Sequence, residues 1–332
     1  MIGNICMFAH RSKIIIGTQT VAETPLLLPS FSSKGFPQVR QIMNLMAEFI
    51  TSPILISAYD VHYTFIPAKI TFPQLIFLDS GGYEASIEHD LSETYGKLHK
   101  PKPWNQRLHE RVLKRWSSKW PTVAVSFDSP AKFLTLSKQI DGATELQRTH
   151  PDLLSELLVK PERPKLFIPF EKLIKRVEHL RQFSVVGITE KELDDSLFGA
   201  MTKIARLRTQ MNAAGVNVPI HIFGSLDPLT TVLYFLAGAE IFDGLTWLRF
   251  GYHEGHTIYC QNYAVIHDSA GLRLRTHEQY HEMWRSNYYY LEKLRTQMIN
   301  FERTGDLSHF GGIEPQLRDA LTQLQGTVPD AR

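Results

Sequence analysis

Leu75-Ile76-Phe77-Leu78, followed at once by Asp79-Ser80-Gly81-Gly82-Tyr83, is the stretch from which the fold of this 332-residue chain can be argued. The apolar run has the length and the aromatic and branched residues of a buried strand. The two glycines allow a tight turn in which the backbone can approach a ligand closely. A carboxylate, a hydroxyl and an aromatic ring therefore follow a strand, which is where parallel α/β proteins place their active sites.

Short apolar runs alternate with amphipathic segments along most of the chain. Apolar residues at helical spacing indicate helices over 38–50, 170–181 and 190–213. Eight runs alternating with helices predict a (β/α)8 TIM barrel with a reduced C-terminal helical extension; a doubly wound open sheet is the alternative. The expected strands are Leu26–Leu28, Ile54–Ser57, Leu75–Leu78, Val123–Phe127, Leu166–Ile168, Ser184–Val186, Ile220–Phe223 and Ile241–Phe242.

Composition sets the expected organisation and location. We expect one barrel domain over residues 1–300, with a basic insertion at 84–119, and a polar, frayed tail at 301–332. A formal charge of +2 neither demands nor excludes a nucleic-acid partner. Two cysteines give no disulfide framework, and the first residues lack the regions of a signal peptide. With no apolar segment long enough to span a membrane, a cytoplasmic protein is expected.

A second junction between a strand and a carboxylate lies far downstream, where Phe242-Asp243-Gly244 is followed by Arg249. With Asp79-Ser80-Gly81-Gly82-Tyr83, it resembles the Asp-Ser-Gly-Gly-aromatic and Phe-Asp-x-x-x-x-x-Arg segments of the tRNA-guanine transglycosylase (queuine/archaeosine tRNA-ribosyltransferase) family. Three further segments are similar to that family and occur in its order, so the resemblance covers most of the chain. They are Val21–Pro29, Ser126–Asp128 and Asn287–Leu291.

The resemblance implies a pentosyltransferase that exchanges guanine for a 7-deazaguanine base in a nucleic acid and that needs no cofactor. It implies that Asp243 is the nucleophile, forming a covalent aspartyl–sugar intermediate, and that Asp79 handles the proton. Displacement of a base at an anomeric carbon calls for such a division between a nucleophilic carboxylate and a proton-transfer group. The structural alternative for each aspartate is a helix N-cap or a turn residue.

Further residues are implied to hold the base. Asp128 could accept the N–H donors of a guanine-like edge, although it could equally cap a helix beginning near Pro130. Tyr83 and Phe223 are implied to sandwich the ring, with Phe223 where other members tend to carry Met. Backbone groups at Gly187 and Ile188 are implied to contact the incoming base, unless Gly187 marks a simple turn. The other implied substrate-binding residues are Ser80, Gly81, Gly82, Gly224 and Arg249.

The chain departs from the tRNA enzymes in two places. Pro169-Phe170-Glu171 stands where those enzymes usually present a glutamine and glycines, so the base-reading set is altered. The Cys-x-Cys-x-x-Cys zinc cluster is reduced to Cys260. A residual zinc site made by Cys260 with His253, His256, His277 or His281 is an alternative, but no metal is expected.

These departures bear on the polymer and on possible partners. Lys100, Lys102, Arg107 and Arg111 lie in the insertion among tryptophans, which suits phosphate contacts and base stacking. The alternative is a solvated helix whose tryptophans pack on the barrel. In lacking the zinc cluster, the chain resembles a divergent branch of the family that inserts 7-deazaguanine bases into DNA. This resemblance favours DNA over tRNA, and in duplex DNA the target base would be flipped out. A homodimer through the aromatic helix Tyr280–Tyr290, or operon partner proteins, are further expectations.

Two other functions remain open at this level. One is a non-catalytic subunit of the same fold that binds nucleic acid or a partner protein. The other is an unrelated barrel enzyme acting on a small phosphorylated metabolite, for which residues 245–249 make a poor phosphate loop.

Overall fold

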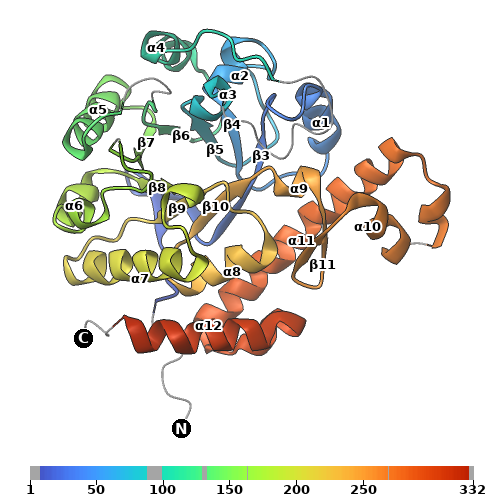
Figure 1. Cartoon of the computed structure of the whole chain (residues 1–332). Coiled ribbons are helices and arrows are strands. Elements are labelled where there is room, and N and C mark those ends of the chain that lie inside the picture. The colour runs from blue at the N-terminus through green and yellow to red at the C-terminus, as the bar shows by residue number, and fades with distance from the viewer. Residues whose placement is uncertain (1–7, 88–98, 129–132, 163, 268, 329–332) are drawn as a thin grey trace.

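Eight parallel strands close into a barrel surrounded by helices (Figure 1). The computed structural model describes residues 8–87, 99–128, 133–162, 164–267 and 269–328. The strand order is β10-β3-β4-β5-β6-β7-β8-β9, and β10 pairs with β3, setting Asp243 beside Leu28. The predicted TIM barrel is therefore confirmed, and the open sheet is excluded. The barrel strands are β3 (Leu26–Phe31), β4 (Ile54–Ser57), β5 (Ile76–Asp79), β6 (Thr122–Val125), β7 (Leu154–Val159), β8 (Val185–Thr189), β9 (Ile220–Phe223) and β10 (Ile241–Gly244).

The helices lie outside the barrel, in the connections between strands and after the last strand. Several begin with a side chain that accepts a backbone N–H, as Ser196 and Asp227 do at the starts of α7 and α8. The helices are α1 (Val39–Met46), α2 (Ala58–His62), α3 (Gly82–Ala85), α4 (Gln106–Arg115), α5 (Leu136–Thr149), α6 (Phe170–Ile174), α7 (Leu197–Ala213), α8 (Pro228–Leu236), α9 (Thr246–Arg249), α10 (Cys260–His267), α11 (Thr276–Thr304) and α12 (Glu314–Thr327), with 3-10 turns at Val177–Gln182, Glu190–Glu192, Ser269–Arg273 and Leu307–Ile313.

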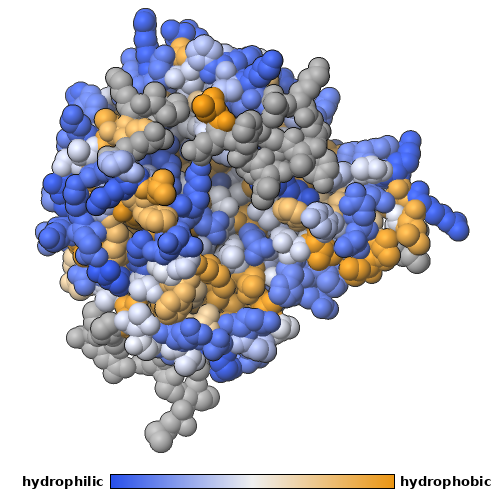
Figure 2. Space-filling model, viewed as in Figure 1, coloured by the Kyte–Doolittle hydropathy of each residue, from blue (hydrophilic) through white to orange (hydrophobic). Residues whose placement is uncertain are grey.

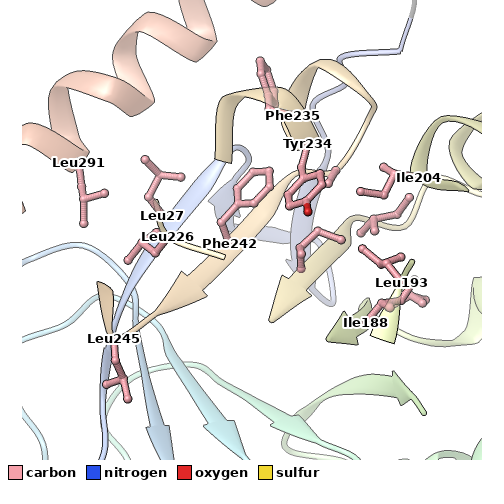
Figure 3. Packing of buried hydrophobic residues seen from close by; sticks show 14 of the residues in the cluster. Leu27, Ile188, Leu193, Ile204, Leu226, Tyr234, Phe235, Phe242, Leu245 and Leu291 are labelled. Carbon is pink, nitrogen blue, oxygen red and sulfur yellow. The ribbon is translucent and has the colours of Figure 1, made fainter. Parts of the chain in front are cut away.

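Side chains alternate along each strand between the barrel interior and the helix layer. Leu28 and Phe77 belong to the cluster that fills the barrel, whereas Leu27 and Phe242 belong to the cluster shared with the helices. Figure 3 shows Phe242 of β10 near Phe235 of α8, and Leu291 of α11 on the side of Leu27. Because every second residue of a strand faces the same side, a polar residue in register with these inward apolar residues also points into the barrel.

A two-stranded hairpin precedes the barrel. It consists of β1 (Lys13–Ile16) and β2 (Gln19–Glu23), paired antiparallel. Ile14 is almost fully buried and belongs to the barrel-interior cluster together with Leu26 and Ile241, the first residues of their strands. The hairpin therefore closes the end of the barrel at which the strands begin, leaving the opposite end for a site.

One expected strand is wrong. Residues Leu166–Ile168 form no strand, and the barrel strand in this part of the chain is β7, which comes twelve residues earlier. Ile168 is buried next to the start of α6. The physical reason is that Glu156 interrupts the apolar pattern of β7. Its carboxylate points into the barrel, where its partner is His221 of β9.

The end of the chain also differs from expectation. Helix α11 continues past Phe301 to Thr304, and α12 follows it, so the described part of 301–332 is no frayed tail. Leu317, Leu321 and Leu324 of α12 are buried, on a helix that lies along the lower face of the molecule below α7 and α8 in Figure 1. Regularly spaced leucines therefore outweigh the polar composition of this segment.

The start of α11 and helix α10 form an arm at the side of the barrel (Figure 1). Figure 2 shows apolar surface on this arm, where Tyr259, Val265, Ile266 and Leu272 are exposed. β11 (Gly251–His253) and β12 (His256–Ile258) form a short antiparallel pair that leads into it. Within the described residues, no helix is both long and apolar enough to cross a membrane.

Candidate active site

The ends of the barrel strands gather the predicted acidic residues at one mouth. Asp79 ends β5, Asp243 is the last residue but one of β10, and Asp128 follows β6. Burial is the main cause that raises the pKa of Asp79, and the Asp243 carboxylate at the same end of the barrel adds to it. A Cβ on Gly82 would lie 2.9 Å from Asp128 Oδ2, so Asp128 packs directly over the glycine turn. Residues that are 164 positions apart therefore share one site.

Asp243 is held by donors on both carboxylate oxygens. The Ser30 hydroxyl donates to Oδ2 at 2.8 Å, and the Gly224 backbone N–H donates to Oδ1 at 3.1 Å. Gly224 has a φ of +83°, a conformation that favours glycine. Gly224, expected to bind substrate, thus contacts the carboxylate directly. A carboxylate oxygen has two lone pairs, and Oδ2 keeps one of them after accepting from Ser30.

His221 lies beneath Asp243 and was missed by sequence reasoning. Its Nε2 lies 3.2 Å from Asp243 Oδ1, and its Nδ1 lies 2.8 Å from Glu156 Oε1. Burial alone would lower its pKa, but the attraction of the Glu156 and Asp243 carboxylates outweighs burial and raises the pKa to about 9. The ring is therefore an imidazolium at neutral pH, with both nitrogens donating. The signal in the sequence was a histidine and a glutamate at inward positions of apolar strands.

Asp79 has the opposite electrostatic environment. Burial, then the nearby Glu84 carboxylate, raises its pKa to about 7, although the Gly81 N–H donates to Oδ2 at 2.9 Å. Gly81 has a φ of +88°, and a Cβ there would lie 2.7 Å from the Tyr59 Cβ, so the turn requires glycine. At neutral pH, Asp79 is therefore divided between its acid and its carboxylate forms, as a group that both gives and takes a proton should be.

Ser80 is shielded from solvent in the glycine turn. It is fully buried, and its backbone carbonyl accepts from the Trp104 indole N–H at 2.9 Å. Trp104 therefore holds the backbone of this turn, and the expected role of Ser80 in substrate binding stays a prediction. This contact could not be read from the motif, since Trp104 lies 24 residues further along the chain.

Two more buried acids stand behind Asp79. Asp60 accepts from the Ser33 N–H at 2.7 Å, and Glu84 accepts from the Ser32 hydroxyl. Burial and the charge of Glu84 raise the pKa of Asp60 well above its usual range. Asp60, Glu84 and Asp79 form an acidic cluster, and repulsion between their negative charges favours the protonated forms of Asp60 and Asp79. Sequence reasoning missed Asp60 and Glu84.

Asp128 has a cationic neighbour that was also missed. Lys160 follows β7, and its Nζ lies 3.4 Å from Asp128 Oδ2 and 2.7 Å from Glu192 Oε2. The position expected for an altered base-reading residue was 169–171, but Pro169 and Phe170 begin α6. Since β7 ends at Val159, it is Lys160 that the strand delivers to the mouth.

The two aromatic residues expected to sandwich a base have different surroundings. Tyr83 accepts from Arg249 Nη2 at 3.2 Å through its hydroxyl, and the Lys34 ammonium lies 4.5 Å from its ring centroid. Phe223 is 9% exposed and stacks on His221, with ring centroids 3.9 Å apart. Phe223 therefore covers the imidazolium from the mouth side.

Gly187 and Ile188 are placed differently from expectation. β8 continues to Thr189, so both residues are paired inside the sheet, with β7 on one side and β9 on the other. A Cβ on Gly187 would lie 2.4 Å from Phe223 Cε2 and 2.5 Å from Glu156 Oε1. The glycine is therefore needed to admit these two side chains. Neither a base-contacting loop nor a simple turn lies at this position.

The basic insertion has one exposed and one packed side. Lys100, Lys102, Arg107 and Arg111 are all exposed. The indole N–H groups of Trp104 and Trp116 donate to Ser80 O and to Thr122 Oγ1 at 2.9 Å and 3.0 Å, so these rings pack on the barrel. The cations are available to a polyanion, whereas these tryptophans are not placed to stack on bases. Residues 88–98 and the region near Pro130 lie outside the described residues.

Candidate metal ligands do not assemble in the part of the chain that the structure describes. No group of three or more His, Cys, Asp or Glu side chains is placed there to hold a metal ion. Cys260 is buried, His253 Nδ1 lies 3.2 Å from His267 Nε2, and His277 and His281 pair with each other on α11.

Comparisons with known proteins do not place the chain in a family. No protein-family profile matches it. A curated relative, receptor-type guanylate cyclase gcy-6 of Caenorhabditis elegans, is 33% identical over 105 residues, which is 28% of this chain. The chain spans about 9% of the length of that relative. Such a short match carries no argument about the activity of this site.

Proposed function

We propose that this chain exchanges guanine for a 7-deazaguanine base in a nucleic acid, by double displacement at the ribosyl or deoxyribosyl C1′. The observation that carries the proposal is the pairing of Asp243, hydrogen-bonded on both oxygens, with Asp79, whose pKa is about 7, at one barrel mouth. Two neighbouring carboxyls in opposite environments are the arrangement that nucleophilic displacement at an anomeric carbon requires.

In the first half-reaction, Asp243 Oδ2 attacks C1′ with its remaining lone pair. The C1′–N9 bond breaks, its electron pair goes to guanine, and the guanine takes a proton from the acid form of Asp79. The His221 imidazolium lies against Oδ1 and stabilises the anionic carboxylate both before attack and when it leaves again.

The second half-reaction runs in reverse with a different base. The Asp79 carboxylate takes the N9 proton of the incoming 7-deazaguanine. The N9 electron pair then forms the new bond to C1′, and Asp243 leaves as a carboxylate. Asp79 ends protonated as it began, so each cycle consumes no proton and needs no cofactor.

Asp128 and Lys160 supply complementary groups for the guanine edge. The carboxylate accepts from ring and exocyclic N–H groups, and the ammonium donates to an acceptor such as O6. In the structure they lie 3.4 Å apart and satisfy each other. A guanine-like base that inserts between them would replace this contact with two of its own.

The test is base exchange followed by mass spectrometry, run in parallel on DNA and tRNA with several 7-deazaguanines. We expect incorporation into DNA rather than tRNA, and loss of exchange by at least about 10³-fold in Asp243→Asn. The control Asp319→Asn, at an exposed position on α12, should leave exchange unchanged. Binding of nucleic acid without exchange on either polymer would instead support the non-catalytic subunit.

A further inference from the structure

A separate cavity of about 420 Å³ lies between the β3–α1 connection and α11. Its volume falls within the range of small-ligand sites. Asp79, Asp128 and Asp243 do not line it. Its lining includes Phe36, Gln41, Ile42, Arg249, His281 and Trp284.

The cavity has an apolar, aromatic floor and a polar rim. Phe36, Ile42 and Trp284 are buried, and the Trp284 indole N–H is already bonded to Leu248 O at 3.0 Å. Gln41 and His281 are exposed, and both carry groups that donate and accept hydrogen bonds. A flat ring with polar atoms on its edge matches this division, because its faces stack on aromatic side chains while its edge meets the rim.

The cavity lies next to the barrel mouth and shares Arg249 with it. Arg249 lines it and also donates to the Tyr83 hydroxyl of the mouth at 3.2 Å. On the other wall, Ser30 of β3 donates to Asp243, and Gly35 and Phe36 of the connection that follows β3 line the cavity. Both walls therefore run directly from residues of the reaction site.

We propose that the cavity binds the base of the nucleotide next to the reacting one on the same strand. The inference rests on the proposed function, since it takes the polymer to be a nucleic acid. The Arg249 guanidinium then lies beside the phosphodiester that joins the two nucleotides, where its charge is favourable. A strand held at two successive positions also fixes the reacting sugar over Asp243.

The experiment uses single-stranded oligonucleotides that contain one target guanosine. The nucleotide on its 5′ or its 3′ side is intact, abasic, or 2-aminopurine, whose fluorescence reports stacking. Binding is measured by anisotropy with wild type, with Gln41→Ala/His281→Ala, and with the control Gln210→Ala/His179→Ala, in which both positions are exposed and outside the cavity.

For wild type and control, we expect removal of the neighbouring base on one side only to weaken binding by between about 5-fold and 100-fold. Quenching of 2-aminopurine is expected on that same side. In Gln41→Ala/His281→Ala the intact strand should bind more weakly and the abasic strand equally well, so that the difference shrinks.

Equal sensitivity in wild type and Gln41→Ala/His281→Ala, or equal effects on both sides, would overturn the inference. So would a change of oligomeric state in that variant during sedimentation, which would assign the cavity to a second copy of the chain. Base exchange is measured in parallel. Side-specific binding without exchange would overturn the proposed chemistry and leave the cavity assignment standing. Exchange without side-specific binding would overturn the cavity assignment and leave the proposed chemistry standing.

Discussion

Replacement of the buried His221 by glutamine tests whether an imidazolium holds the proposed nucleophile. The folded pKa of about 9, against an ordinary 6.5, corresponds to about 3 kcal/mol of stability. Because the folded state binds the proton more tightly, this contribution is complete below pH 6.5 and is lost as the pH rises through 9. The free energy of unfolding of the wild type should therefore fall by about 3 kcal/mol over this range.

In His221→Gln the fall between pH 7 and 9 should be absent. At pH 6 the variant should be less stable by about 3–5 kcal/mol, because Glu156 and Asp243 lose a buried cationic partner. Any remaining pH dependence should move to lower pH, where a buried carboxyl keeps the proton instead. The exposed His179→Gln is the matched control and should behave like the wild type.

Urea denaturation at half-unit steps from pH 5 to 9 measures these effects. Asp79 does not confuse the result, since its pKa of about 7 places its own loss of stability between about pH 4 and 7, and Asp79→Asn should remove that separate window. Wild-type stability that stays constant between pH 7 and 9, together with a neutral imidazole in the nitrogen NMR spectrum, would refute the reasoning.

Three further outcomes are expected. Neutralising the exposed Lys100, Lys102, Arg107 and Arg111 should weaken binding to any nucleic-acid sequence and reduce the slope of log K against log salt by roughly 0.7–0.9 per lost phosphate contact. Neutralising the exposed Lys138, Lys175, Lys293 and Arg303 is the control and should leave the slope unchanged. An unaltered slope in the first variant would show that the insertion is a solvated surface that does not contact phosphates. Gly187→Ala should lower the free energy of unfolding, measured by urea denaturation, by about 1–3 kcal/mol, because the new Cβ would clash with Phe223 and Glu156. In the control Gly142→Ala in α5, the new Cβ meets nothing within 4 Å, so the free energy of unfolding should be unchanged or higher. Metal analysis of the purified protein should find well below one equivalent of zinc, and stoichiometric zinc that is lost with stability in Cys260→Ser would contradict this.

The barrel could be predicted from the sequence because its strands are short apolar runs at regular intervals. All the expected strands except Leu166–Ile168 coincide with barrel strands, although their ends differ by a few residues. The exception has a physical cause. A strand such as β7 is stabilised by pairing with its neighbours in the closed sheet, which the local sequence does not show. A three-residue apolar run can therefore match the pattern of a strand better than β7, which contains an inward glutamate.

The acidic residues of the mouth were predictable for a related reason. Asp79 and Asp243 come at the ends of clear apolar runs, so the topology alone brings them together. The roles of His221, Glu156 and Lys160 were not predictable. Each residue lies within or just after a strand, and its role depends on a partner that is distant in the sequence. Glu156 and His221 are 65 residues apart and meet through closure of the barrel.

The most direct test of the central claim is to locate the covalent intermediate. Wild-type protein is mixed with a guanosine-containing oligonucleotide in the absence of an incoming base, denatured rapidly, digested and mapped by mass spectrometry. The account predicts a sugar adduct on the peptide that contains Asp243, with guanine released in equal amount, and no adduct in Asp243→Asn. An adduct on another residue, or an Asp243→Asn variant that exchanges bases at the wild-type rate, would contradict it.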